Sequence, residues 1–194
     1  SAEGMEVVIL VSVGDYVAFG APIAEIRTLT NQPDLSAHSS AIRKVIKLEE
    51  QRDLDADPAF GVEEMVTIGW TSISTAKSNP DPGLLTIWNL RDLLARWLAT
   101  DPAFSDKEDD ESSPAPIVYT DRLSEQLIKG FESLSVVACE SMQHQSLAEI
   151  YLTFAGLFHR LPSFLRRQVA DLIQRSLSGL GDHILTSDLD ASLA

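Results

Sequence analysis

The chain has 194 residues, of which 44% are hydrophobic and 23% are charged, a composition that excludes a wholly disordered or fibrous protein. Its 29 acidic residues against 15 lysines and arginines give a formal net charge of -14, which disfavours binding to nucleic acid. The single cysteine excludes an internal disulfide, and the longest apolar run, Val7 to Val13, is too short to span a membrane.

The first part of the chain, residues 1–32, has the pattern of a small β element. Apolar residues alternate with their neighbours as they do in strands: Val7, Ile9, Val11, Val13, Val17 and Phe19. Turn residues at Gly14-Asp15 and at Gly20 separate these runs. We therefore expect a β-hairpin or a small curled sheet.

Residues 33–100 change to a helical period and predict a helical region. Ser36 is a candidate cap for a first helix, and Asp57-Pro58 places a cap residue before a proline at the first position of a second. The second helix should end near Lys77. The turn signal from Asn79 to Gly83 then places the start of a third helix at Leu84.

The helical period also predicts which side chains are buried. In the second helix one face holds Val62, Met65, Val66, Gly69, Trp70 and Ile73. In the third, the expected buried side holds Trp88, Leu94, Trp97 and Leu98. Both tryptophans at 70 and 88 are thus expected in the core.

Residues 101–116 contain six acids, one lysine and three prolines with few apolar residues, which predicts a mobile acidic linker. Residues 117–194 return to helical spacing and predict a C-terminal helical region. Leu161-Pro162 interrupts that pattern, and the tail from Asp182 is expected to fray. The chain therefore has an expected α+β fold, with a small N-terminal hairpin or curled sheet and a mostly α-helical body of about six helices.

Four polar residues bracket the second helix and the turn after it: Arg52, Asp57, Asn79 and Asp81. Asp57 as a helix cap with an arginine partner would be a structural feature. The same four residues are the candidates for a binding site, and both interpretations stay open. We expect Arg52 and Asp57 to be paired or to share a network in either case.

Metal and thiol chemistry have little support in the sequence. The histidines His38, His144, His159 and His183 are scattered, without the i, i+4 spacing of a helical metal site. A site that joins His144 and His159 to Glu140 or Glu149 is the alternative, and we predict no metal. Cys139 has an apolar context without a nearby basic residue, so we expect a buried, inert thiol.

A small basic cluster stands out in this acidic chain. Arg43 and Lys47 are one helical turn apart, with Lys44 beside them. A solvated helix face is one explanation, and contact with lipid headgroups or an acidic partner is the other.

The segment from Val13 to Ile26 resembles the Gly-Asp-x-Val-x-x-Gly segment of biotinyl and lipoyl carrier domains. Those carriers attach their cofactor to a lysine at a hairpin tip, whereas the first lysine here is Lys44. We therefore predict that neither biotin nor lipoate is attached and that the protein has no cofactor.

The stretch from Gln51 to Ile68 is similar to the signature of the predicted bacterial membrane proteins grouped as domain of unknown function 2254. The matching residues there are Arg52, Asp57, Pro58, Phe60 and Gly61. Upstream, Val13 to Val17 with Gly20, Pro22 and Ile23 resembles the family's Gly-Asp-Phe-Val segment. The later turn departs from the family pattern, since Thr75 follows Ser74 where the family has proline.

This resemblance implies that the chain is the soluble extramembrane part of a cell-membrane protein, with membrane spans before Ser1. It also implies assembly or regulation through protein contacts, with the upstream transmembrane region and a second copy of the chain as the expected partners. One alternative is a domain that gates a channel or transporter. Another is an enzyme that uses a cluster of Arg52, Asp57 and Asp81.

Overall fold

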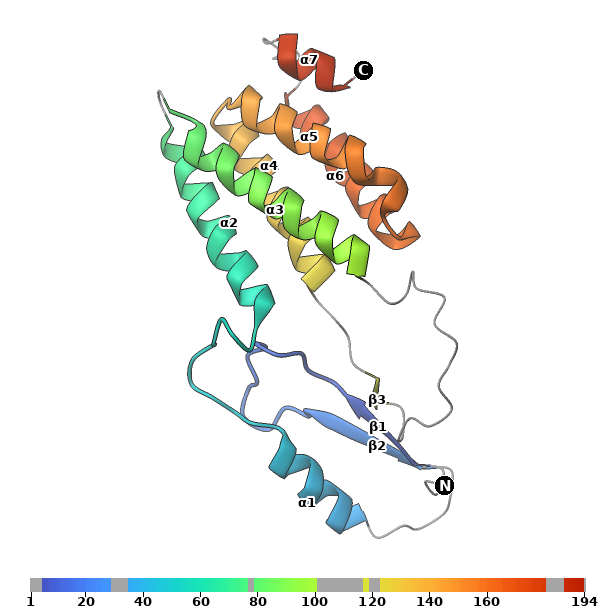
Figure 1. Ribbon diagram of the computed structural model, residues 1–194. Coiled ribbons are helices and arrows are strands. Elements are labelled where there is room, and N and C mark those ends of the chain that lie inside the picture. Colours follow the sequence, from blue (N-terminus) through green and yellow to red (C-terminus); the bar gives the residue numbers. More distant parts are fainter. Residues whose placement is uncertain are drawn as a thin grey trace. The chain divides into compact units, whose positions relative to one another are not determined.

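The structure is a computed structural model that describes residues 5–28, 35–76, 79–100, 117–118, 123–180 and 187–193 (Figure 1). Its elements in chain order are β1 (Met5–Ile9), β2 (Ala24–Thr28), α1 (Leu35–Val45), α2 (Pro58–Thr75), α3 (Asp81–Thr100), β3 (Ile117–Val118), α4 (Leu123–Glu140), α5 (His144–Leu157), the 3-10 turn η2 (Phe158–Arg160), α6 (Ser163–Leu180) and α7 (Ser187–Leu193). The expected α+β fold with a mostly helical body is confirmed, with seven α-helices in the described ranges.

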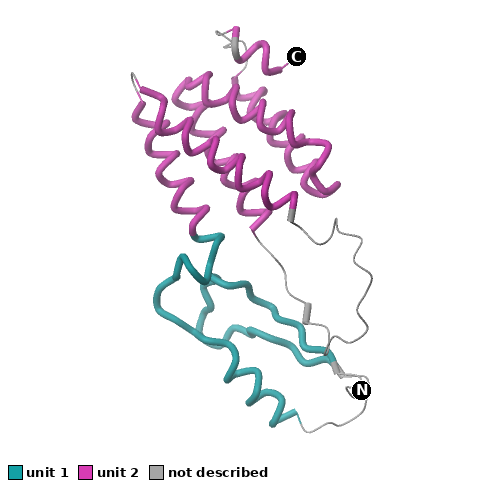
Figure 2. The backbone as a smooth tube through the Cα atoms, viewed as in Figure 1, with its two compact units in different colours: residues 1–60, 106–122 teal, residues 61–105, 123–194 magenta. Residues whose placement is uncertain are grey.

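The chain folds as two compact units (Figure 2). Unit 1 comprises residues 1–60 and 106–122, and unit 2 comprises residues 61–105 and 123–194. The sequence boundaries after residues 32, 100 and 116 mark changes of composition, whereas these units follow packing. The acidic segment 101–116 lies outside the described residues, so its mobility stays a prediction.

Unit 1 contains a three-stranded sheet in the order β2-β1-β3. β1 pairs antiparallel with β2, placing Val7 opposite Ile26, and pairs parallel with β3, placing Val7 also beside Ile117. The helical pattern over 117–194 did not predict β3, because two residues are too few to show a strand period. This short strand comes from far along the chain and completes the sheet.

The connection between β1 and β2 corrects the expected strand pattern. β1 ends at Ile9, and the alternating residues that follow lie in a long loop from Leu10 to Ile23. Gly14 and Gly20 have φ angles of +83° and +81°, which are left-handed conformations that interrupt a strand. Local alternation therefore overestimated the length of the sheet.

The start of α3 differs from the prediction. The helix begins at Asp81, and the amide of Leu84 already donates to the carbonyl of Pro80 at 3.0 Å. Pro82 is accommodated because residues in the first helical turn have no intrahelical acceptor to reach. The segment predicted as a turn thus supplies the first turn of α3.

The buried hydrophobic core of the described residues lies in unit 2, where α3, α4, α5 and α6 pack together. The rings of Phe131 on α4 and Phe154 on α5 meet edge to face with centroids 5.1 Å apart. Gly130 allows α4 to approach α2 closely, since a Cβ there would lie 2.7 Å from Cγ2 of Val66. Close helix packing therefore fixes this unit.

The prediction that Trp70 and Trp88 are buried is wrong, because both side chains are about half exposed. Each follows a residue that faces the core, Gly69 on α2 and Ile87 on α3. One helical residue turns the side chain by about 100°, which carries each indole away from the core. The sequence pattern identifies the apolar stripe in both helices but places its edge one residue too far.

The C-terminal pattern is confirmed in its three long helices, α4, α5 and α6, with the interruption at Leu161-Pro162. The expected fraying from Asp182 is wrong for Ser187–Leu193, which forms α7. Leu189 is fully buried, and α7 packs against α5. Burial of this leucine stabilises a seven-residue helix that would be marginal alone.

Candidate functional site

Arg52 and Asp57 form an ion pair within unit 1. Nε of Arg52 donates to Oδ2 of Asp57 at 2.7 Å. The Asp57 side chain is 4% exposed and that of Arg52 is 29% exposed. The predicted pairing is confirmed, and because the carboxylate is almost entirely buried, its arginine partner compensates a charge that water cannot reach.

Asp57 is also the N-cap of α2. Its Oδ1 accepts a hydrogen bond from the amide of Phe60 at 3.2 Å, the third residue of the helix, and Pro58 occupies the first position. The two carboxylate oxygens therefore have separate tasks, one in the helix cap and one in the ion pair.

The guanidinium of Arg52 also contacts the aromatic ring of Phe60. Cζ of Arg52 lies 4.7 Å from the centroid of the Phe60 ring, within the range of a cation–π contact. The cap, the ion pair and the ring contact thus form one network from three residues. All three belong to the Arg-to-Gly61 stretch that carries the family resemblance.

Gly14 connects the second family-like segment, Val13 to Val17, to this network. A Cβ at Gly14 would overlap Oδ2 of Asp57 and lie 2.8 Å from Nε of Arg52. Only glycine fits this approach, and its φ of +83° independently favours glycine. The structure therefore places Gly14 against Arg52 and Asp57, a contact between the two family-like segments that the sequence did not predict.

Asn79 and Asp81, the other two candidate residues, have a local role in unit 2. Oδ1 of Asn79 accepts a hydrogen bond from the amide of Asp81 at 3.1 Å, immediately before and at the start of α3. Both residues are exposed. Arg52 and Asp57 precede α2 along the chain whereas Asn79 and Asp81 follow it, and a shared role for all four stays a prediction.

The histidines and Cys139 take the following positions. In the described ranges, no group of three or more His, Cys, Asp and Glu side chains could hold a metal ion; His183 lies outside these ranges. His144 is buried at the start of α5. Burial, reinforced by the charge of Glu140, raises the pKa of the Cys139 thiol, which favours its unreactive form.

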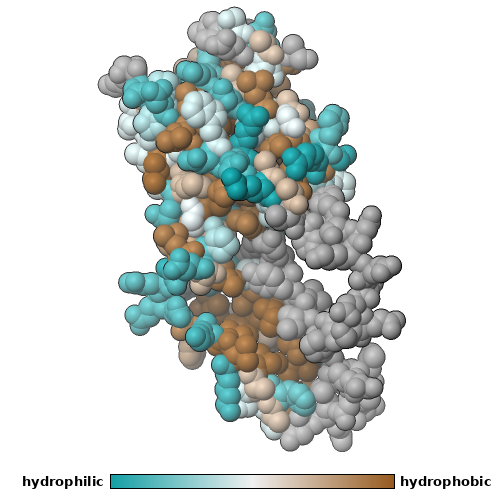
Figure 3. Space-filling view, in the orientation of Figure 1, coloured by the Kyte–Doolittle hydropathy of each residue, from teal (hydrophilic) through white to brown (hydrophobic). Residues whose placement is uncertain are grey.

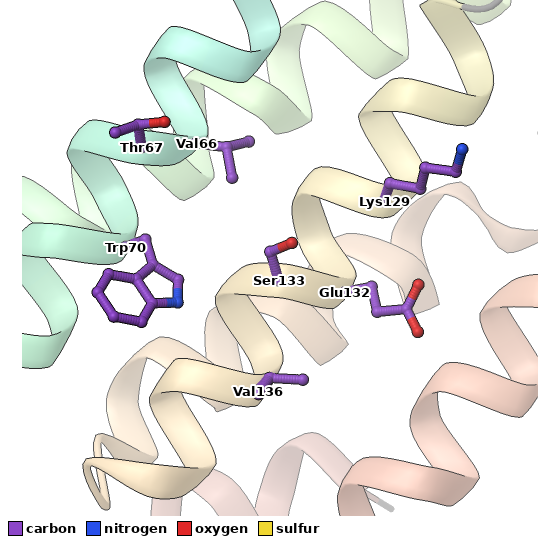
Figure 4. Close-up of a pocket in the computed structure, with 7 residues that line it drawn as sticks. All are labelled: Val66, Thr67, Trp70, Lys129, Glu132, Ser133 and Val136. Carbon is purple, nitrogen blue, oxygen red and sulfur yellow. The ribbon is translucent and has the colours of Figure 1, made fainter.

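A surface groove runs between α2 and α4 (Figure 4). It has a volume of about 690 Å³ and is lined by Val66, Thr67, Trp70, Lys129, Glu132, Ser133 and Val136. A second groove of about 400 Å³ lies between α4 and α6 and shares Glu132 and Val136 with the first. The helical pattern placed Val66 and Trp70 together on one apolar face of α2, but it did not predict that both residues line the groove between α2 and α4.

No curated protein and no solved structure matches the chain. Among the helices of the described residues, none combines the length and hydrophobicity that a membrane crossing requires. One family model, described as predicted membrane protein (DUF2254), matches residues 1–146. That range contains both segments that meet at Gly14, Arg52 and Asp57. The chain therefore belongs to the DUF2254 family of predicted membrane proteins.

Proposed function

We propose that this chain is an extramembrane module of a membrane protein and that it acts by self-association through the groove between α2 and α4. The observation that carries the proposal is the apolar lining of that groove, in which Trp70 and Val136 are about half exposed. Membership of a membrane-protein family supports the first part of the proposal.

The shape of the groove favours a protein partner over a small molecule. Five of its seven lining residues are exposed, whereas small-molecule sites bury most of their ligand's surface. A groove between two helices suits the apolar face of a third helix. Covering Trp70 and Val136 would remove apolar surface from water, which drives association.

The charges on α4 favour a second copy of the same chain as the occupant. Lys129 and Glu132 are one helical turn apart on the groove and have opposite signs. In a two-fold contact between antiparallel α4 helices, Lys129 of each copy faces Glu132 of the other. Within one copy, Oε1 of Glu132 forms an ion pair with Nη1 of Arg175 at 2.7 Å. The second carboxylate oxygen of Glu132 is then the acceptor for Lys129 of the other copy.

Sedimentation of the 194-residue chain over a range of concentrations tests self-association. We expect a dimer that Val136→Glu dissociates, because the variant buries an unpaired charge. Leu152→Glu is the matched control, since Leu152 is 45% exposed on α5 against 50% for Val136. A wild type that stays monomeric at all concentrations, or equal dissociation by both variants, would refute the proposal.

The membrane part of the proposal has a separate test. We expect the gene to encode at least one segment of about 20 predominantly apolar residues upstream of Ser1. The transmembrane region formed there would be the module's other partner. An upstream reading frame with only polar sequence would overturn this part while leaving self-association standing.

A further inference from the structure

The loop between β1 and β2, Leu10 to Ile23, exposes an unusual set of apolar side chains. Tyr16 is 94% exposed and Phe19 is fully exposed, with Leu10 and Val13 about half exposed. Figure 3 shows hydrophobic side chains gathered on the visible face of unit 1. Large apolar groups that gather on a surface mark a contact with a partner or a membrane.

This loop is held in place. Gly14 lies directly against Arg52 and Asp57, and the Asp15 carboxylate accepts a hydrogen bond from the amide of Ser12 at 2.8 Å. Asp15 is also the only charged residue between Leu10 and Ile23. The loop therefore presents its aromatic side chains from a fixed backbone, with its one charge engaged locally.

The helix that follows in unit 1 adds a concentration of positive charge. Residues 35–48 include Arg43, Lys44 and Lys47 but no acid, in a chain with a net charge of -14. Arg43 and Lys44 lie in the last turn of α1, and Lys47 follows two residues after the helix ends at Val45. All three are exposed, and within the described part of the chain none of them forms an ion pair.

α1 has no buried residue, so its packing on the rest of unit 1 is light. Val45 and Leu48, beside the cations, are mostly exposed. A helix that only covered a core would bury an apolar stripe, whereas an interfacial helix keeps apolar and cationic residues available together. The packing of α1 is thus more typical of an interfacial helix than of a helix that covers a hydrophobic core.

Arg52 links the basic cluster to the apolar loop. Lys47 is five residues before Arg52, whose guanidinium reaches the loop at Gly14. Five extended residues span at most about 17 Å, which is therefore the upper limit of the distance between the Cα atoms of Lys47 and Arg52. Apolar side chains with nearby cations are the two signals that stable binding to an anionic membrane requires.

We propose that unit 1 binds an anionic lipid surface. Tyr16 and Phe19 enter the headgroup region, where aromatic side chains are favoured, and Arg43, Lys44 and Lys47 contact lipid phosphates. This lipid contact is separate from self-association through α2 and α4. Binding should depend steeply on salt and on anionic lipid, because it relies on the positive charges of the basic cluster. Glu49 and Glu50, which follow the cluster, and the acidic charge of the whole chain oppose this attraction.

Flotation of the 194-residue chain with phosphatidylcholine vesicles, with and without phosphatidylglycerol, tests this inference. We expect binding to the anionic vesicles at low salt. Replacing Arg43, Lys44 and Lys47 together by Gln should weaken it on the order of 100-fold, since each cation near the surface contributes about fivefold. Tyr16→Ser with Phe19→Ser should also weaken binding while leaving its salt dependence in place.

The matched control replaces three exposed cations of unit 2, Arg91, Arg160 and Arg167, by Gln. This variant changes the net charge of the chain by the same amount but leaves Arg43, Lys44 and Lys47 in place. It should therefore bind anionic vesicles within about twofold of the wild type. Equal loss in both triple variants would show that net charge alone matters and would overturn the proposal. So would a wild type that floats only with vesicles carrying the protein's own membrane region, which would assign the loop to a protein partner.

Discussion

Replacing Asp57 by alanine should destabilise unit 1 by about 2–3 kcal/mol. Loss of the N-cap hydrogen bond to Phe60 contributes about 1 kcal/mol. Loss of the charge-assisted bond from Arg52 would contribute about 1.5–3 kcal/mol in a buried site. We place this second contribution at the lower end of that range, because the arginine side chain is 29% exposed and water can solvate it in the variant.

Asp57→Asn separates the two contributions. Asparagine is as good a cap as aspartate and has nearly the same shape, so the bond to Phe60 should survive. The variant loses the negative charge that Arg52 contacts. We therefore expect it to cost about 1–2 kcal/mol, less than Asp57→Ala.

Hydrogen exchange under conditions that report the opening equilibrium measures these effects unit by unit. Asp57→Ala should accelerate exchange in β1 and β2 by about 30- to 150-fold, which corresponds to 2–3 kcal/mol. The amides of α4, in unit 2, serve as the internal control. If exchange in both strands stays within about twofold of wild type, the network does not stabilise unit 1 and the reasoning fails.

Three further predictions concern unit 2. Gly130→Ala should be about 2 kcal/mol less stable than Gly179→Ala in urea titrations, because a Cβ at 130 meets Val66 whereas position 179 faces open space; equal midpoints would contradict the close approach. Leu189→Ala should raise hydrogen exchange throughout α7 but not in α4, since the buried leucine holds α7 on the bundle, and unchanged exchange would show another anchor. Burial raises the pKa of the Cys139 thiol and of the Tyr151 hydroxyl, so the folded state keeps these protons longer than the unfolded state; stability should be complete at neutral pH and fall as pH rises above about 9, and Tyr151→Phe should flatten that fall.

Several features were predictable because short stretches of sequence determine them. Asp57 and Pro58 mark a helix start by their own backbone and side-chain chemistry, and Arg52 lies close enough along the chain to pair with the cap. The helical periods of α4, α5 and α6 likewise follow from residues within each helix. Local rules fail at the edges of such patterns, as the exposed indoles of Trp70 and Trp88 show.

The sequence by itself determined the α+β class, the helix cap at Asp57 and the separate importance of the Gly14 and Asp57 segments. Only the tertiary structure decided that Gly14 lies against Arg52 and Asp57, that β3 joins β1, and that Leu189 secures α7. The physical reason is that caps and periods depend on neighbours within one or two helical turns, whereas these contacts join residues that are distant along the chain. Their stability depends on how whole elements pack, and no local pattern encodes that.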